Sequence, residues 1–113
     1  MEKRRLKWPE NAKLYFDMLR HEIRMSKPYM AIESYSRELG KLSVYPYIVG
    51  AVKKGTGFIA RLLGKKLVEF EHTKGEEGEI RVNDRSLRKI VSSFVSEHDP
   101  RNYGLTLDVK MAV

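Results

Sequence analysis

Residues 67–83, LVEFEHTKGEEGEIRVN, contain two short runs with a strand pattern. Apolar and polar residues alternate in 67–72 and again in 79–83, which is the two-residue period of strands with one buried face. Residues 73–78 between them are glycine and polar residues that favour turns. The stretch therefore predicts a β-hairpin with a long tip.

Helical and strand patterns flank this hairpin on both sides. After it, Asp84 is expected to cap a helix whose apolar residues recur at helical spacing: Leu87, Ile90, Val91, Phe94 and Val95. Residues 105–113 then alternate again and predict a terminal strand. Before the hairpin, Pro9 suits a first helical turn, the Lys27-Pro28 pair predicts a break, and a second short helix is expected to stop at Gly40.

Residues 44–66 could form one helix or two. Gly50, Gly55 and Gly57 together cost roughly 3 kcal/mol of helix propensity relative to alanine, which favours two. We therefore expect helices over 46–54 and 58–65, joined by a turn at 55–57. The predicted fold is a single α+β domain, 1–113: N-terminal helices (1–43), a helix pair with a wing-like hairpin (44–83), and an amphipathic helix with a C-terminal strand (84–113).

The positive charge is concentrated in one part of the chain. The formal net charge is +7. Residues 39–68 contain six lysine or arginine residues and no aspartate or glutamate, whereas residues 69–113 have more acidic than basic groups. A focused positive field is typical of proteins that bind a polyanion, although the same side chains could simply be solvated.

The composition indicates the kind of organism and the cellular compartment in which the protein works. Cysteine is absent, which excludes disulfides, thiolate metal sites and cysteine nucleophiles. Glutamine is also absent and a third of the residues are charged, a pattern typical of hyperthermophiles, so an archaeal source is expected. No apolar run is long enough for a membrane span or a secretory signal, and the expected location is the cytoplasm.

Residues 51–82 resemble a winged helix-turn-helix. Ala51-Val-Lys-Lys-Gly55 has the small-residue-to-glycine spacing of that motif, 58–66 would be its second helix, and 67–70 with 79–82 would be the wing. The resemblance implies binding to duplex DNA. The expected contact residues are Lys53, Lys54, Gly55, Thr56, Gly57, Arg61, Lys65, Lys66, Lys74 and Arg81.

The order of elements is also similar to that of an RNA-binding KH domain, whose GXXG loop clamps the nucleic-acid backbone. The corresponding residues here, 53–57, lack the first glycine. In both cases, glycines would let backbone N–H groups approach a phosphate while Lys53 and Lys54 supply charge. The alternative is a turn that needs glycine only for its backbone conformation.

Catalytic patterns are incomplete. Gly50 and Gly55 have P-loop spacing, but Thr56-Gly57 stand where a lysine and a hydroxyl residue are required. A LAGLIDADG-type nuclease would need an acidic metal ligand near Thr56. The three histidines are scattered without metal-ligand spacing. We therefore expect no enzyme activity, no metal and no cofactor.

The expected function is non-catalytic nucleic-acid binding, with duplex DNA favoured over RNA, as a regulator or chromatin-type accessory factor. An RNA-binding or ribosome-associated factor is the alternative. A subunit that binds an acidic protein, or a metal-dependent nuclease, are possibilities from other classes. The C-terminal helix or strand could also pair with a second copy to form a homodimer.

Overall fold

The computed structural model describes residues 6–38, 47–52, 55–62 and 65–111. Its elements, in chain order, are α1 (Glu10–Arg24), α2 (Lys27–Glu38), β1 (Tyr47–Val52), β2 (Gly55–Leu62), β3 (Lys65–Thr73), β4 (Gly78–Val82), the 3₁₀ turn η1 (Arg85–Leu87), α3 (Arg88–Glu97), the 3₁₀ turn η2 (Pro100–Tyr103) and β5 (Leu107–Met111). The predicted α+β class is confirmed. Two N-terminal helices are present as predicted, but the break between them is at residues 25–26, and Lys27-Pro28 begins α2 instead of interrupting the helical pattern.

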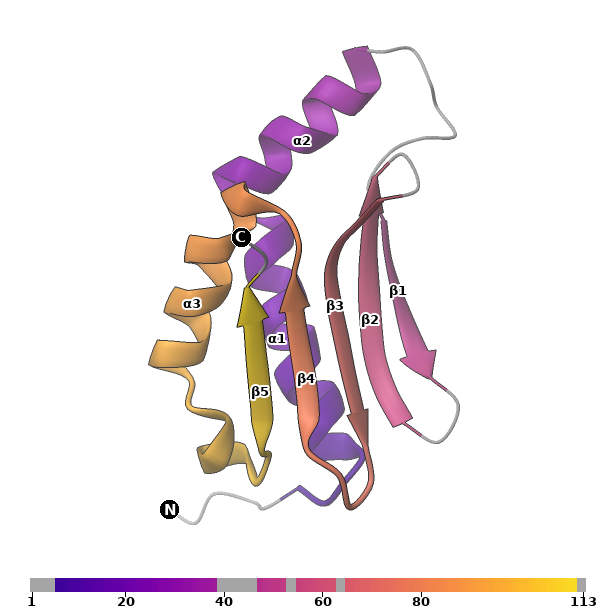
Figure 1. The fold of residues 1–113 in the computed structure, drawn as a ribbon, viewed down its shortest axis with the longest axis vertical. Coiled ribbons are helices and arrows are strands. Elements are labelled where there is room, and N and C mark those ends of the chain that lie inside the picture. Colours follow the sequence, from indigo (N-terminus) through magenta and orange to yellow (C-terminus); the bar gives the residue numbers. More distant parts are fainter. Residues whose placement is uncertain (1–5, 39–46, 53–54, 63–64, 112–113) are drawn as a thin grey trace.

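The strands form one five-stranded sheet in the order β1-β2-β3-β4-β5 (Figure 1). The first four strands are antiparallel neighbours. Strand β5 lies parallel to β4, because η1, α3 and η2 return the chain to the end of the sheet at which β4 begins. The predicted hairpin is confirmed as β3 and β4, in which Phe70 lies opposite Ile80. The predicted terminal strand is confirmed as β5.

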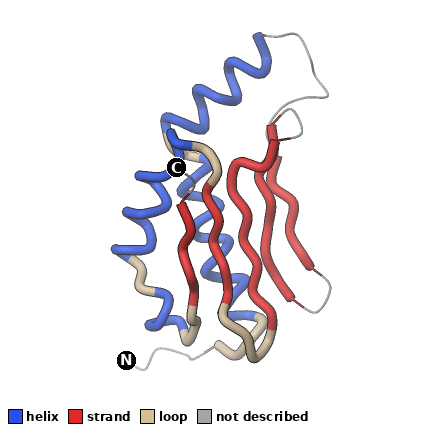
Figure 2. The backbone as a smooth tube through the Cα atoms, viewed as in Figure 1, coloured by secondary structure: helices blue, strands red, loops and turns tan. Residues whose placement is uncertain are grey.

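Helices α1 and α3 pack on one face of the sheet, so the core lies between the helices and this face (Figure 2). Phe16 of α1 lies 5.2 Å from Phe70 of β3, ring centroid to ring centroid, and Phe70 lies 4.3 Å from Phe58 of β2. Tyr15 contacts Phe94 at 5.3 Å and joins α1 to α3. The apolar residues of each alternating strand face these helices, which explains why the opposite face is charged.

The prediction of two helices, over 46–54 and 58–65, is wrong. Residues 47–52 and 55–62 are the strands β1 and β2, paired so that Val49 lies opposite Ile59. Gly57 explains part of the difference, because a Cβ there would collide with the carbonyl oxygen of Phe70 on β3. This glycine therefore permits close approach of two strands rather than a turn between two helices.

Two predicted helix starts also differ from the structure. Asp84 precedes η1 rather than α3, and its carboxylate accepts a hydrogen bond from the Ser86 hydroxyl instead of capping backbone N–H groups. Pro9 lies just before the first helical residue, Glu10. The expected stop at Gly40 lies outside the described residues.

Candidate nucleic-acid interface

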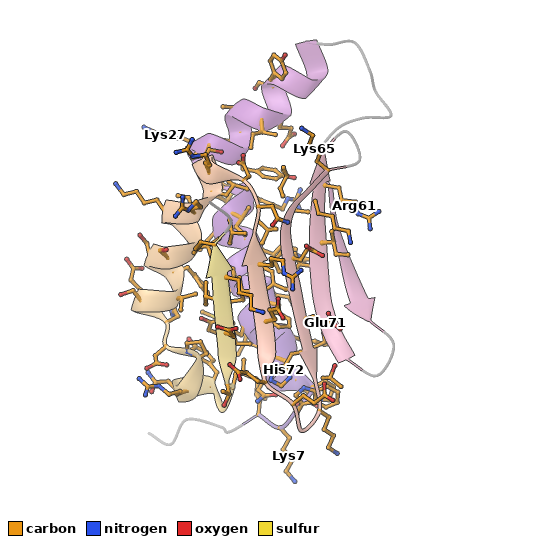
Figure 3. The ribbon with its side chains drawn as sticks, in the orientation of Figure 1. Lys7, Lys27, Arg61, Lys65, Glu71 and His72 are labelled. Atoms are coloured by element: carbon orange, nitrogen blue, oxygen red, sulfur yellow. The ribbon has the colours of Figure 1, made fainter. Side chains whose placement is uncertain are left out.

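Three of the predicted contact residues meet where β2 ends and β3 begins. Arg61 lies opposite Lys66 in the β2–β3 ladder, and Leu62 lies opposite Lys65. The register shifts between Ala60 and Arg61, and this irregularity sets Arg61 against Lys66 rather than against the apolar Leu67. We call the three cations Arg61, Lys65 and Lys66 the basic end; Arg61 and Lys65 are labelled in Figure 3.

The basic end places like charges close together. Directly opposed like charges destabilise an antiparallel pair by a few tenths of a kcal/mol to about 1 kcal/mol, and the Arg61–Lys66 pair has this arrangement. Arg61 forms no ion pair with any described residue, and its Nε is shielded from solvent without an acceptor. An anion placed between the two side chains would relieve this repulsion.

Lys66 has an acidic neighbour on its own strand. Its Nζ lies 3.4 Å from a carboxylate oxygen of Glu69, and the Lys66 side chain is 47% exposed. An exposed ion pair of this kind contributes at most about 1 kcal/mol, so Lys66 can exchange it for a phosphate contact. Lys65 is exposed and forms no ion pair within the described part of the chain.

Further cations follow β4 at the same end of the sheet. The Asn83 side chain donates to the carbonyl oxygen of Lys66 at 3.1 Å, and its backbone N–H donates to that of Leu67 at 2.8 Å. These bonds hold the end of β4 against the start of β3, so the residues that follow Asn83 begin beside the basic end. They include three cations that the sequence analysis did not select: Arg85, Arg88 and Lys89. They could have been selected from the sequence, because three basic residues fall within five positions shortly after a predicted strand.

The glycine segment does not form the expected phosphate-binding loop. Residues 55–57 belong to β2 and lie opposite residues 71–73 of β3, so their backbone groups belong to the sheet. Thr56 is buried, and Gly57 is covered by the β3 backbone. They also lie at the other end of β2 from Arg61. Lys53 and Lys54 lie outside the described residues.

The two remaining predicted contacts are not part of the basic end. Lys74 is in the β3–β4 turn, at the opposite end of the sheet. Arg81 lies on the open face of the sheet, and its Nε donates to Glu79 at 2.9 Å. This hydrogen bond lowers the pKa of Glu79 and raises that of Arg81, so both stay charged and neutralise each other. The expected single cationic face is therefore divided.

The open face of β3–β5 is unsuited to a phosphate backbone. Its charged residues are four acids and two bases: Glu69, Glu71, Glu79, Asp108, Arg81 and Lys110. Lys110 is held 3.6 Å from Glu79, so both bases have acidic partners. On the open face, both Arg81 and Lys110 therefore have their charge offset by Glu79.

Other parts of the described structure are weaker candidates for a functional site. A surface pocket of about 330 Å³ lies between α1 and α2, but Arg20 in it is paired with Asp17 at 3.4 Å. Within the described residues, no three histidine or acidic side chains are placed to hold a metal ion. None of the described helices is both long and apolar enough to cross a membrane.

Comparison with known proteins gives no relative: no family model, no curated protein and no solved structure matches this chain.

Proposed function

We propose that this protein is a non-catalytic nucleic-acid-binding protein that holds the phosphate backbone of duplex DNA at its basic end. The observation that carries the proposal is the cross-strand pair of Arg61 and Lys66, two directly opposed cations of which only Lys66 has a carboxylate partner, Glu69, among the described residues. Phosphates present negative charge at regular spacing and fit such a pair.

The cations of η1 and α3 would extend this contact. Arg85 and Lys89 are exposed, and Arg88 is partly exposed. With them, the proposed interface would have six cations for phosphate contacts. Contacts of this kind position a protein on nucleic acid without reading its sequence.

The mode of contact differs from that of a recognition helix. The residues that would have formed the helix-turn-helix are strands. The proposed contact therefore comes from strand ends and a helix start, which suits an accessory or chromatin-type role better than selection of one operator sequence.

A salt series tests the proposal. Filter binding of the whole chain to a duplex should give an affinity that falls with salt at a log–log slope of about −5 if six phosphates are contacted. A flat response would contradict nucleic-acid binding.

Competition then tests the choice of duplex DNA. Unlabelled duplex should displace the labelled duplex at lower concentration than single strands or structured RNA. Preferential displacement by RNA would replace duplex DNA with RNA as the ligand. Binding to an acidic protein with defined stoichiometry, and to no nucleic acid, would contradict the proposal altogether.

A further inference from the structure

Strand β5 ends the sheet and leaves one edge open. It pairs with β4 on one side, and no described strand pairs with its other side. The backbone N–H of Gly78 donates to the carbonyl oxygen of Thr106 at 2.8 Å. In a parallel ladder alternate residues face the neighbouring strand, so Asp108 and Lys110 also bond to β4. The backbone groups of Leu107, Val109 and Met111 therefore point to the open edge.

The sequence of β5 is complementary to itself when reversed. In an antiparallel pair of two copies centred on Val109, Asp108 lies opposite Lys110 of the second copy, and Lys110 lies opposite Asp108. Leu107 lies opposite Met111 in the same pairing. Both charged side chains are about half exposed, so the weak ion pairs of Lys110 with Glu79 and Asp108 can be exchanged for pairs across the edge. Opposite charges at directly paired positions stabilise an antiparallel pair.

The hydrogen-bonding groups select the same register. With Val109 at the centre, the residues whose backbone groups face outward pair only with one another. A shift that centres the pair on Asp108 or on Lys110 keeps this match but sets two like charges opposite each other. The register centred on Val109 is thus favoured by both backbone and side chains.

We propose that two copies of this chain associate through their β5 edges in this register, which joins two five-stranded sheets into one. A twofold axis through the Val109 pair makes the interface isologous, as in most homodimers. This inference does not depend on nucleic-acid binding.

The helix layer is compatible with this arrangement. Helix α3 runs beside β5 (Figure 1), so the two α3 helices would approach each other when the edges pair. The exposed residues of α3 include the short side chains Ser92, Ser93 and Ser96. Short side chains at a helix contact permit a small distance between helix axes.

Charge exchange tests the register directly. In Asp108→Lys both edges become basic, and in Lys110→Asp both become acidic, so each variant alone repels its own copy. Mixed in equal amounts, the two variants can form a mixed pair in which both lysines of one copy lie opposite both aspartates of the other. We expect light scattering to show the wild-type chain at twice 13.2 kDa, each single variant with at least about tenfold weaker self-association, and the mixture restored to the dimer.

Val109→Pro provides a second test that leaves the charges unchanged. Its N–H faces the open edge, so proline removes hydrogen bonds of the dimer and none from the β4 ladder. We expect a monomer with an unchanged far-ultraviolet circular dichroism spectrum. A monomeric wild-type chain, a mixture that does not associate, or a dimer in Val109→Pro would each overturn the proposal.

Discussion

His72 is a buried histidine held in one protonation state by its surroundings. It is 7% exposed, and its Nδ1 accepts a hydrogen bond from the Trp8 indole at 2.9 Å. The indole can only donate, so Nδ1 must be unprotonated and the proton of the neutral ring is on Nε2. Burial lowers the pKa of His72 in the folded chain.

This lowered pKa predicts a loss of stability in mild acid. Above the unfolded pKa of about 6.5, the ring is neutral in both states and the Trp8 bond is intact. As the pH falls below 6.5, the unfolded chain binds a proton that the folded chain resists, so the free energy of unfolding decreases until the folded pKa is passed. Thermal unfolding between pH 8 and pH 5 should show this decrease. His72→Asn should show a smaller one, and an equal decrease in both proteins would contradict the assignment.

Among the described glycines, Gly57 is the one at which an added Cβ would collide most closely, and the collision is with the Phe70 backbone, which cannot move aside like a side chain. We expect Gly57→Ala to lower the free energy of unfolding by about 2 kcal/mol, within the range for overpacked sites. Gly75→Ala is the comparison: φ is 80° there but the site is open, so the expected cost is about 1 kcal/mol. Denaturant unfolding of both variants measures the difference. An equal or smaller loss in Gly57→Ala would show that the strands can separate.

At the scale of elements, α1 is fixed to the end of α3 by one buried hydroxyl. The Tyr15 hydroxyl donates to the carbonyl oxygen of His98 at 2.7 Å, and burial raises the pKa of Tyr15, so the hydroxyl stays protonated. Tyr15→Phe leaves that carbonyl without this donor and should lower the free energy of unfolding by about 1 kcal/mol. Tyr35→Phe, at an exposed side chain, should have no measurable effect in the same urea titration. Equal effects in the two variants would mean that this bond does not hold the helices together.

The elements also show where sequence patterns suffice. The strands around Phe70 and Ile80 alternate cleanly and the helix through Val91 has one apolar face, so both were predicted correctly. Residues 47–62 have apolar runs without a clear period, and such runs do not distinguish strand from helix. Their glycines were interpreted as a turn, whereas Gly57 allows two backbones to meet.

The sequence indicated which residues belong to the candidate site but not how they are arranged in space. The absence of acids in residues 39–68 pointed to Arg61, Lys65 and Lys66, which the structure places at one end of the sheet. That Arg61 faces Lys66 depends on the register shift in β2–β3, a tertiary feature without a local signature. Asn83 holds the end of β4 against the start of β3 through hydrogen bonds that the sequence does not reveal, so Arg85, two residues later, was not selected.

At the scale of the whole molecule, charge is separated by position. Cations gather at the end of the sheet near α2, where Figure 3 places Arg61 and Lys65, while the open face carries more acids than bases. A polyanion would therefore be attracted to one end and repelled from the open face. This separation predicts that net charge alone does not determine binding.

Two triple variants with the same net charge test that claim most directly. Arg61→Ala/Lys65→Ala/Lys66→Ala removes the basic end, and Lys7→Ala/Lys13→Ala/Lys74→Ala removes three exposed lysines elsewhere. The measurement is the salt dependence of duplex binding for both variants and the wild type. We predict that the first variant reduces the log–log slope by about 2 to 3, while the second leaves it within about 1 of the wild type. Equal reductions in the two variants would contradict a binding site at the basic end.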